Sequence, residues 1–182
     1  MAKNKRPQDR QEKHDEIVAA ARSLFLDEGF DAVSMARLAA AAGIAPNTIY
    51  WYFKDKDEVL ATVLSNVFSE HWLAYLAADF PKPIDKLLWF VARLQEASIL
   101  ISTVHTRLRT SSAIHIWHDN FHLMLEALIC NELMTLGVLE ADVDALTTIL
   151  IFTIEGLLIH QSSEALSYRI CETLLRQLKL NI

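Results

Sequence analysis

Apolar residues recur every three or four positions along most of this chain, and few residues interrupt the pattern. Ile17, Ala21, Leu24 and Phe25 give one clear example. A repeat of this kind is typical of amphipathic α-helices. Only four Gly and four Pro occur among 182 residues, which argues against a turn-rich β fold. The sequence therefore predicts an all-α protein with about nine helices.

Capping and helix-breaking residues predict where these helices begin and end. The first helix is expected to end at Gly29, and Ser34 is the expected N-cap of a short second helix. A capping box, Asp55 to Glu58, opens a helix that continues past residue 70. The remaining helices are expected at residues 84–101, 103–110, 113–136, 141–161 and 164–180.

Two of the short helices form a helix-turn-helix. Gly43 allows a tight turn before a helix expected at residues 46–53, and Leu38, Ile44 and Ile49 are placed to form a small core. An ordinary helical hairpin would show the same apolar pattern. The second helix, however, carries hydroxyl and amide groups suited to phosphates and base edges, on Asn47, Thr48, Tyr50 and Tyr52.

Charge is unevenly distributed between the two parts of the chain. The net charge is −6, but residues 1–56 hold nine Lys/Arg against eight Asp/Glu, whereas residues 57–182 hold eight against fifteen. The first 22 residues alone hold six basic and four acidic side chains. This asymmetry indicates a small module that tolerates anions, followed by a larger acidic body.

Several other classes of protein are not supported by the sequence. The longest uncharged run, residues 38–53, contains Gly43 and Pro46 and is too short to cross a bilayer. The basic N-terminus lacks the apolar segment of a signal peptide, and no catalytic or phosphate-loop motif occurs. Cys130 and Cys171 lie in apolar helical patterns, so we expect them to be reduced, buried thiols in a cytoplasmic protein. We also expect no cofactor.

Three histidines offer an alternative reading as a metal site. His115, His118 and His122, with Asp119, are three or four residues apart and share one side of a helix. No fourth ligand is apparent, and such spacing is common by chance in helices. We therefore expect no metal and interpret this group as structural.

The helix-turn-helix and its flanks contain five marked segments: Gly29-Phe30, Leu38-Ala39, Gly43-Ile44, Thr48-Ile49-Tyr50-Trp51-Tyr52-Phe53 and Lys56-Asp57-Glu58-Val59-Leu60. With these segments, this part of the chain resembles the N-terminal domain of the TetR/AcrR family of bacterial transcriptional regulators. The resemblance covers about residues 16–64 and, beyond them, the length, the helix count and the run from Glu155 to Leu158. It implies a DNA-binding domain at residues 1–54 and an effector-binding and dimerisation domain at residues 55–182.

By this resemblance, the protein is a homodimer whose two recognition helices enter successive major grooves of a partly palindromic operator. The family's base-facing positions correspond to Pro46, Asn47 and Thr48, and its phosphate-contacting positions to Thr48, Tyr50, Tyr52 and Lys56. Ser34 and Arg37 match positions near the DNA backbone.

Two features of this module depart from the family pattern or need a separate reading. Ala45 stands where a capping Ser or Thr is common, and the recognition helix has no Arg, so readout of guanine must come from Arg37 or the basic tail. We expect Trp51 and Phe53 to pack the module against its neighbouring helices.

The resemblance further implies a small-molecule pocket in the C-terminal helices. The candidate lining residues are Trp89, His105, Trp117, Phe121, Phe152 and Glu155. Aromatic rings with a few polar groups suit a largely apolar ligand, although each of these residues could also simply fill the core. Glu155 would favour a ligand cation, or it could pair with Arg93, Arg107 or Arg109.

The dimer is expected to form through the last two helices. Gly156 would allow a close helix approach, and Ile149 and Ile159 fall at the same helical spacing. They could equally face the protomer's own core.

The sequence thus favours a DNA-binding regulator that is not an enzyme, most simply a repressor released from its operator by a small ligand. Two alternatives remain open. One is a helical metal- or ligand-dependent enzyme with an incidental helix-turn-helix, and the other is a DNA-binding regulator controlled by a protein partner.

Overall fold

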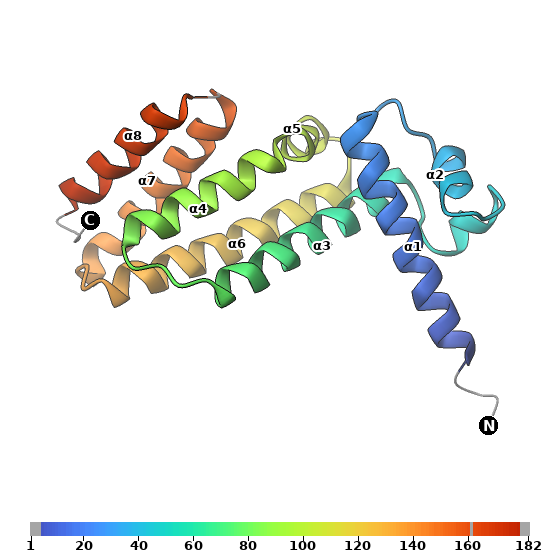
Figure 1. Cartoon of the computed structure of the whole chain (residues 1–182), viewed down its shortest axis with the longest axis horizontal. Helices are drawn as coiled ribbons and strands as arrows, with labels where there is room; N and C mark the ends of the chain where they lie inside the picture. The colour runs from blue at the N-terminus through green and yellow to red at the C-terminus, as the bar shows by residue number, and fades with distance from the viewer. Residues whose placement is uncertain (1–4, 161, 179–182) are drawn as a thin grey trace. The chain divides into compact units, whose positions relative to one another are not determined.

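The computed structural model describes residues 5–160 and 162–178, with side chains from residue 9 onward. Within these residues every regular element is helical, which confirms the all-α prediction (Figure 1). In chain order the elements are α1 (Lys5–Asp27), α2 (Met35–Ala41), the 3₁₀ helix η1 (Thr48–Trp51), α3 (Lys56–Ala77), α4 (Pro83–Glu96), α5 (Ser98–Arg107), α6 (Ser112–Thr135), α7 (Glu140–Ile159) and α8 (Glu164–Gln177).

Contacts divide the chain into two compact units. Unit 1 comprises residues 1–73 and 99–118, and unit 2 comprises residues 74–98 and 119–182. Helices α3 and α6 contribute residues to both units. The functional boundary expected after residue 54 stays a prediction, because these units are defined by contacts alone.

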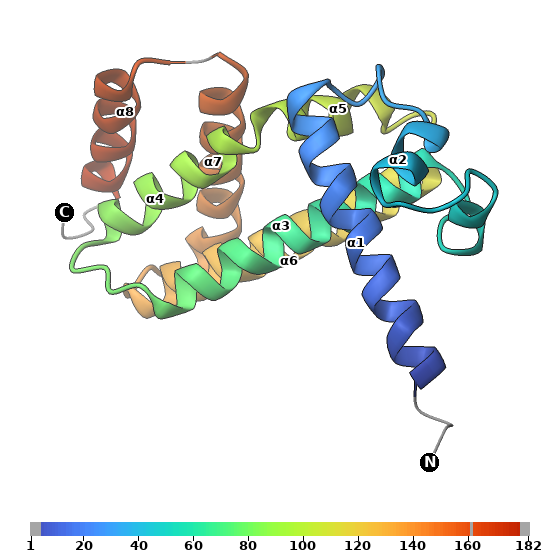
Figure 2. The ribbon, with the colours of Figure 1, turned by 45° about the vertical axis from the view of Figure 1, so that its right-hand side comes forward.

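Unit 1 contains the helix-turn-helix, and its local structure follows the predicted capping pattern. Gly29 and Gly43 adopt φ values of 82° and 66°, which glycine tolerates without a steric penalty. The hydroxyl of Ser34 accepts a hydrogen bond from the Arg37 N–H at 3.1 Å and so caps α2. Helix α1 packs against α2, which contacts η1 (Figure 2). Leu38 and Ile49 are fully buried, as expected for the small core of this module.

The recognition segment is shorter than the sequence predicts. An α-helix was expected over residues 46–53, but the regular part is the single 3₁₀ turn of η1. The side chain of Asn47, at the start of the segment, makes no capping hydrogen bond. With neither a cap nor the length that stabilises an α-helix, the segment takes the tighter turn.

Unit 2 is built on α4, which packs against both α7 and α8. Its core cluster includes Ile84, Leu133, Val143, Leu150 and Leu175. No single helix in the described residues is long and apolar enough to span a membrane.

The expected helix over residues 84–101 is wrong in one respect, because the chain breaks at Ala97 into α4 and α5. Ala97 has φ −93° and ψ 10°, an ordinary helix-end conformation. Since neither Gly nor Pro marks this break, the sequence carried no local signal for it.

Candidate DNA-binding surface

The turn and the 3₁₀ helix expose the side chains that the sequence assigned to DNA. Pro46 and Asn47 are exposed, and Tyr50 retains 55% of its accessible surface. Thr48 and Tyr52 are half-buried. Hydroxyl and amide groups on one exposed turn can donate to phosphates and to base edges without a change in the fold.

Trp51 contradicts the expectation that it packs inside the module. Its side chain is 76% exposed, whereas Phe53 is 2% exposed and stacks on His14 with ring centroids 4.8 Å apart. The packing prediction was therefore right for Phe53 and wrong for Trp51. The two residues lie two positions apart on a tight turn, so their side chains leave it in different directions. An indole this exposed on the candidate DNA-binding turn is available for contact with a partner.

Arg10 of α1 adds a cationic group beside this turn, which the sequence analysis did not single out. Its guanidinium donates a hydrogen bond to the Trp51 carbonyl at 3.2 Å and lies 6.0 Å from the centroid of the Tyr52 ring. The available signal was the excess of basic residues near the N-terminus. Lys3 of that basic tail lies outside the described residues.

Arg37, a candidate for reading guanine, is paired in this structure. Its guanidinium donates to the Glu28 carboxylate at 2.8 Å, and both side chains are exposed. An exposed pair of this kind is worth less than about 1 kcal/mol, so a phosphate or base can compete for the guanidinium.

Lys56 is anchored to the loop between α1 and α2. Its ammonium donates to the carbonyls of Phe30 at 2.7 Å and Val33 at 2.8 Å, and lies 4.1 Å from the centroid of the Phe30 ring. Burial lowers the pKa of this lysine from its ordinary value. Two of its three N–H groups hold the loop, which leaves one N–H for a phosphate.

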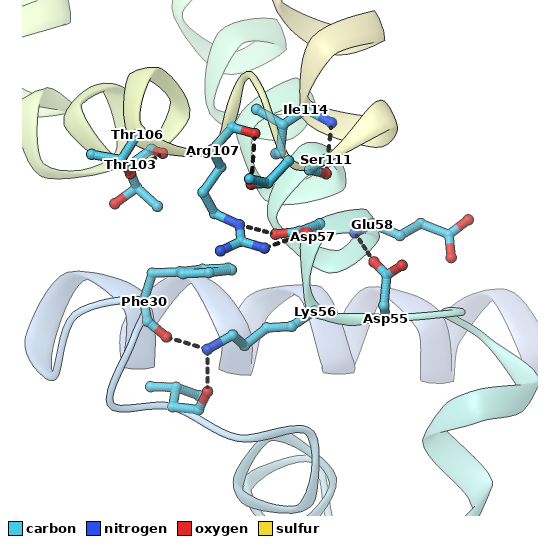
Figure 3. Close-up of polar contacts among 12 residues, drawn as sticks. Phe30, Asp55, Lys56, Asp57, Glu58, Thr103, Thr106, Arg107, Ser111 and Ile114 are labelled. Carbon is cyan, nitrogen blue, oxygen red and sulfur yellow. Dashed lines mark hydrogen bonds and ion pairs between the residues drawn. The ribbon is translucent and has the colours of Figure 1, made fainter.

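An arginine from α5 completes this cluster (Figure 3). Arg107 makes a bidentate pair with the Asp57 carboxylate, with 2.7 Å between Nη2 and Oδ2, and its guanidinium carbon lies 5.0 Å from the Phe30 ring centroid. The hydrogen bond to Asp57 raises the pKa of Arg107. We call Phe30, Lys56, Asp57 and Arg107 the Phe30 cluster. It joins the end of α5, the start of α3 and the loop before α2.

The capping box at the start of α3 is present. The Glu58 N–H donates to the Asp55 carboxylate at 2.9 Å, and the Glu58 carboxylate accepts from the Lys54 N–H at 2.5 Å. The reciprocal bond reaches one residue further back than in the usual box. The capping box therefore fixes the start of α3 at Lys56 and Asp57, which belong to the Phe30 cluster.

The six candidate effector residues divide between the two units. His105 and Trp117 lie in unit 1, where the ring centroids of His105 and His118 are 5.8 Å apart. The other four lie in unit 2: Trp89, Phe121, Phe152 and Glu155.

The contacts of these residues differ from those weighed in the sequence. Glu155 lies 3.6 Å from His122, while Arg93 pairs with Glu96 and Arg107 with Asp57. Unit 2 holds a cavity of about 90 Å³, and none of the six residues lines it. Their joint role in ligand binding stays a prediction.

The three candidate dimerisation residues share one exposed side of α7. Ile149 and Ile159 are exposed, and a Cβ atom built on Gly156 would meet no other atom within 4 Å. Phe152 falls on the same helical face and is 66% exposed. The protomer itself therefore leaves this face uncovered.

The described part of the chain contains no group of three or more His, Cys, Asp or Glu side chains arranged to hold a metal ion. Of the three candidate histidines, His118 contacts His105 and His122 faces Glu155.

These features define a helical protein with a helix-turn-helix near its N-terminus. Residues 17–63 match the family described as bacterial regulatory proteins, tetR family. A helix-turn-helix transcriptional regulator of Haemophilus influenzae is 43% identical over 66 residues, which are 36% of this chain and 35% of that protein. The regulator AcrR of Shigella flexneri is 38% identical over 68 residues, or 37% of this chain and 28% of AcrR.

Solved structures share the fold over nearly the whole chain. A transcriptional regulator from Rhodococcus superposes with a TM-score of 0.70 at 18% identity, covering 91% of this chain and 94% of that one. A TetR/AcrR-family regulator from Thermobifida fusca gives a TM-score of 0.57 at 19% identity, covering 92% and 96%. The chain is therefore similar to regulators of the TetR/AcrR family, by sequence over residues 17–63 and by fold over nearly its whole described length. The aligned segments span only about a third of the length of these curated relatives.

Proposed function

We propose that this protein is a DNA-binding transcriptional regulator, acting in the cytoplasm as a repressor that a small, largely apolar ligand releases from its operator. The observation that carries the proposal is the exposed turn from Pro46 to Tyr52. It presents amide, hydroxyl and indole groups above a core that is fully closed at Leu38 and Ile49.

In this proposal the exposed residues take distinct roles. Pro46, Asn47 and Thr48 face the bases, whereas Tyr50, Tyr52 and the remaining N–H of Lys56 contact phosphates. Ser34 holds the start of α2, and Arg37 exchanges Glu28 for the DNA backbone. Contacts to phosphates position the protein, and contacts to bases give sequence preference.

A homodimer supplies the second recognition turn for a palindromic site. The support for it is the exposed apolar side of α7, with Ile149, Phe152, Gly156 and Ile159 at helical spacing. Apolar side chains that a protomer leaves uncovered in this way are typical of interfaces. Ligand control requires that the ligand bind the DNA-competent and released states unequally.

Selection from a random pool of duplexes tests DNA recognition directly. Wild-type protein should enrich an inverted repeat, and its affinity should fall steeply with salt because phosphate contacts release counterions. Asn47→Ala should change the enriched sequence, whereas Tyr50→Ala should weaken binding to all duplexes.

The matched control is Lys82→Ala, at an exposed position of unit 2, which should bind like the wild type. A pool that yields no inverted repeat, with no salt-dependent binding, would show that the protein is not this kind of regulator. The enzyme alternative would then gain weight.

A further inference from the structure

The cavity in unit 2 is almost entirely apolar. It measures about 90 Å³ and lies between the end of α3, α4, α6, α7 and α8. Leu125, Ile129, Leu150, Ile154 and Leu175 form much of its wall. The cavity is partly open to solvent, so its lining side chains lack packing contacts that a bound molecule can supply.

Three polar side chains stand together among the lining residues. Glu132 accepts a hydrogen bond from the Tyr75 hydroxyl at 2.9 Å and another from the Lys86 ammonium at 2.7 Å. No other residue that lines the cavity has a polar side chain. A cavity formed by imperfect packing alone has no reason to include a connected polar group, whereas a binding site uses such a group to orient its ligand.

The charge of this trio is balanced internally. One ammonium faces one carboxylate, and both side chains are half-buried, with 37% and 27% of their surface exposed. Burial and the hydrogen bond to Glu132 raise the pKa of Tyr75, so the phenol stays neutral. A ligand that brought a full charge into this half-buried site would leave that charge uncompensated.

The trio nevertheless has hydrogen-bonding capacity for a neutral group. The Lys86 ammonium has three N–H groups, of which one donates to Glu132. The carboxylate of Glu132 has about four lone-pair positions. The hydrogen bonds from Tyr75 and Lys86 occupy two of them. A hydroxyl can therefore accept from Lys86 and donate to Glu132 at the same time.

We infer that the unit 2 cavity binds a small neutral aliphatic molecule with one hydroxyl end. Its alkyl part fills the leucine- and isoleucine-lined space, and its hydroxyl meets Lys86 and Glu132. A cavity of about 150 Å³ holds benzene, so by the same ratio the smaller space here encloses about four carbon atoms. The rest of a five-carbon chain and its hydroxyl then lie at the half-buried end, beside Lys86 and Glu132. The regulatory role of this site rests on the proposed function, in which a ligand releases the protein from its operator. The site is separate from the predicted aromatic residues Trp89, Trp117, Phe121 and Phe152.

Three probes with the same alkyl chain test the charge argument on the full-length protein. We would titrate 1-pentanol, pentanoate and pentylammonium and follow the methyl resonances of leucine and isoleucine by NMR. Pentanol should bind at least about tenfold more tightly than either ion, with the largest shifts at Ile129, Ile154 and Leu150. Equal binding of the three probes, or shifts confined to exposed methyl groups, would refute the site.

Two charge variants should reverse the preference. Glu132→Gln leaves Lys86 unbalanced, so pentanoate should become the tightest probe, and Lys86→Gln leaves Glu132 unbalanced, so pentylammonium should. Glu164→Gln, at an exposed position on α8, is the matched control and should keep the wild-type order. Circular dichroism identifies a variant that does not fold, and the wild-type titration decides the question alone in that case.

Operator binding separates this inference from the proposed function. If the protein selects an inverted repeat but pentanol does not bind, the cavity inference fails and DNA recognition stands. If pentanol binds in the cavity of a protein that selects no DNA sequence, the ligand site stands and the regulator proposal fails.

Discussion

Removal of the Arg107 guanidinium should destabilise unit 1 and weaken DNA binding together. Arg107→Gln takes away both hydrogen bonds to Asp57 and the cation that faces Phe30. The Asp57 side chain is only 14% exposed, so its charge would lose its partner in a largely desolvated place. Since Asp57 follows Lys56 in α3, the loop that Lys56 holds before α2 should loosen as well.

The size of the effect follows from burial. Breaking a fully buried pair by removing one partner costs about 3 to 5 kcal/mol. Arg107 is 31% exposed, which reduces this to about 2 kcal/mol, and loss of the cation–π contact adds about 0.5 to 1 kcal/mol. A loss of about 2 to 3 kcal/mol lowers the melting temperature of a chain of this size by about 5 to 10 °C.

Urea denaturation of the wild type, Arg107→Gln, Asp57→Asn and the double variant measures the coupling directly. We expect a coupling free energy of about 1 to 2 kcal/mol from this double-mutant cycle. The far-UV circular dichroism and Trp fluorescence transitions must coincide for the values to be valid. Arg22→Gln is the matched control, because Arg22 forms an exposed pair with Glu70 in the same unit, and should cost less than about 1 kcal/mol. A coupling below about 0.5 kcal/mol would refute the role given to the Phe30 cluster.

Three further results are expected. Trp51→Ala should change the free energy of unfolding by less than about 0.5 kcal/mol, because the indole is exposed. The same variant should lower DNA affinity about tenfold in a fluorescence-anisotropy titration, and unchanged affinity would place the indole outside the DNA interface. Gly156→Trp should give monomers by sedimentation while Gly156→Ala stays dimeric, and an intact tryptophan dimer would contradict the α7 interface. Tyr75 should ionise well above pH 10 in an absorbance titration, and Tyr75→Phe should remove that late step. Because the folded-state pKa is raised above 10.0, stability from this phenol is complete below pH 10 and falls as the pH rises further.

Local signals in the sequence were sufficient to predict much of unit 1. Ser34 and Asp55 cap their helices, and Gly29 and Gly43 take the positive φ angles expected of them. Each of these features depends on a few neighbouring residues, whose conformational preferences act before any tertiary contact forms. The break at Ala97 shows the limit of such signals, because no residue type marks it.

Side-chain direction was less predictable than helix position. A tryptophan in an apolar run is usually buried, so Trp51 was expected to pack, but one 3₁₀ turn directs Ile49 and Phe53 into the core and leaves Trp51 outside. The expected α-helix, with its 3.6-residue period, would distribute side chains over its faces differently from a turn of three residues. The prediction of an α-helix in place of a 3₁₀ helix therefore went together with the wrong prediction that Trp51 is buried.

Pairing between distant residues could not be obtained from the sequence at all. Three arginines were possible partners for Glu155, yet Arg107 belongs to Asp57, fifty positions earlier in the chain, and Glu155 faces His122. Charge and spacing rank such partners equally, because a long side chain on a helix can meet any element packed beside it. The Phe30 cluster and the Tyr75, Lys86 and Glu132 trio both arise in this way. Each joins helices that are remote in the sequence, and each places an ion pair beside a candidate binding site. The sequence located the DNA-binding site only to a helix, and it did not locate the cavity at all.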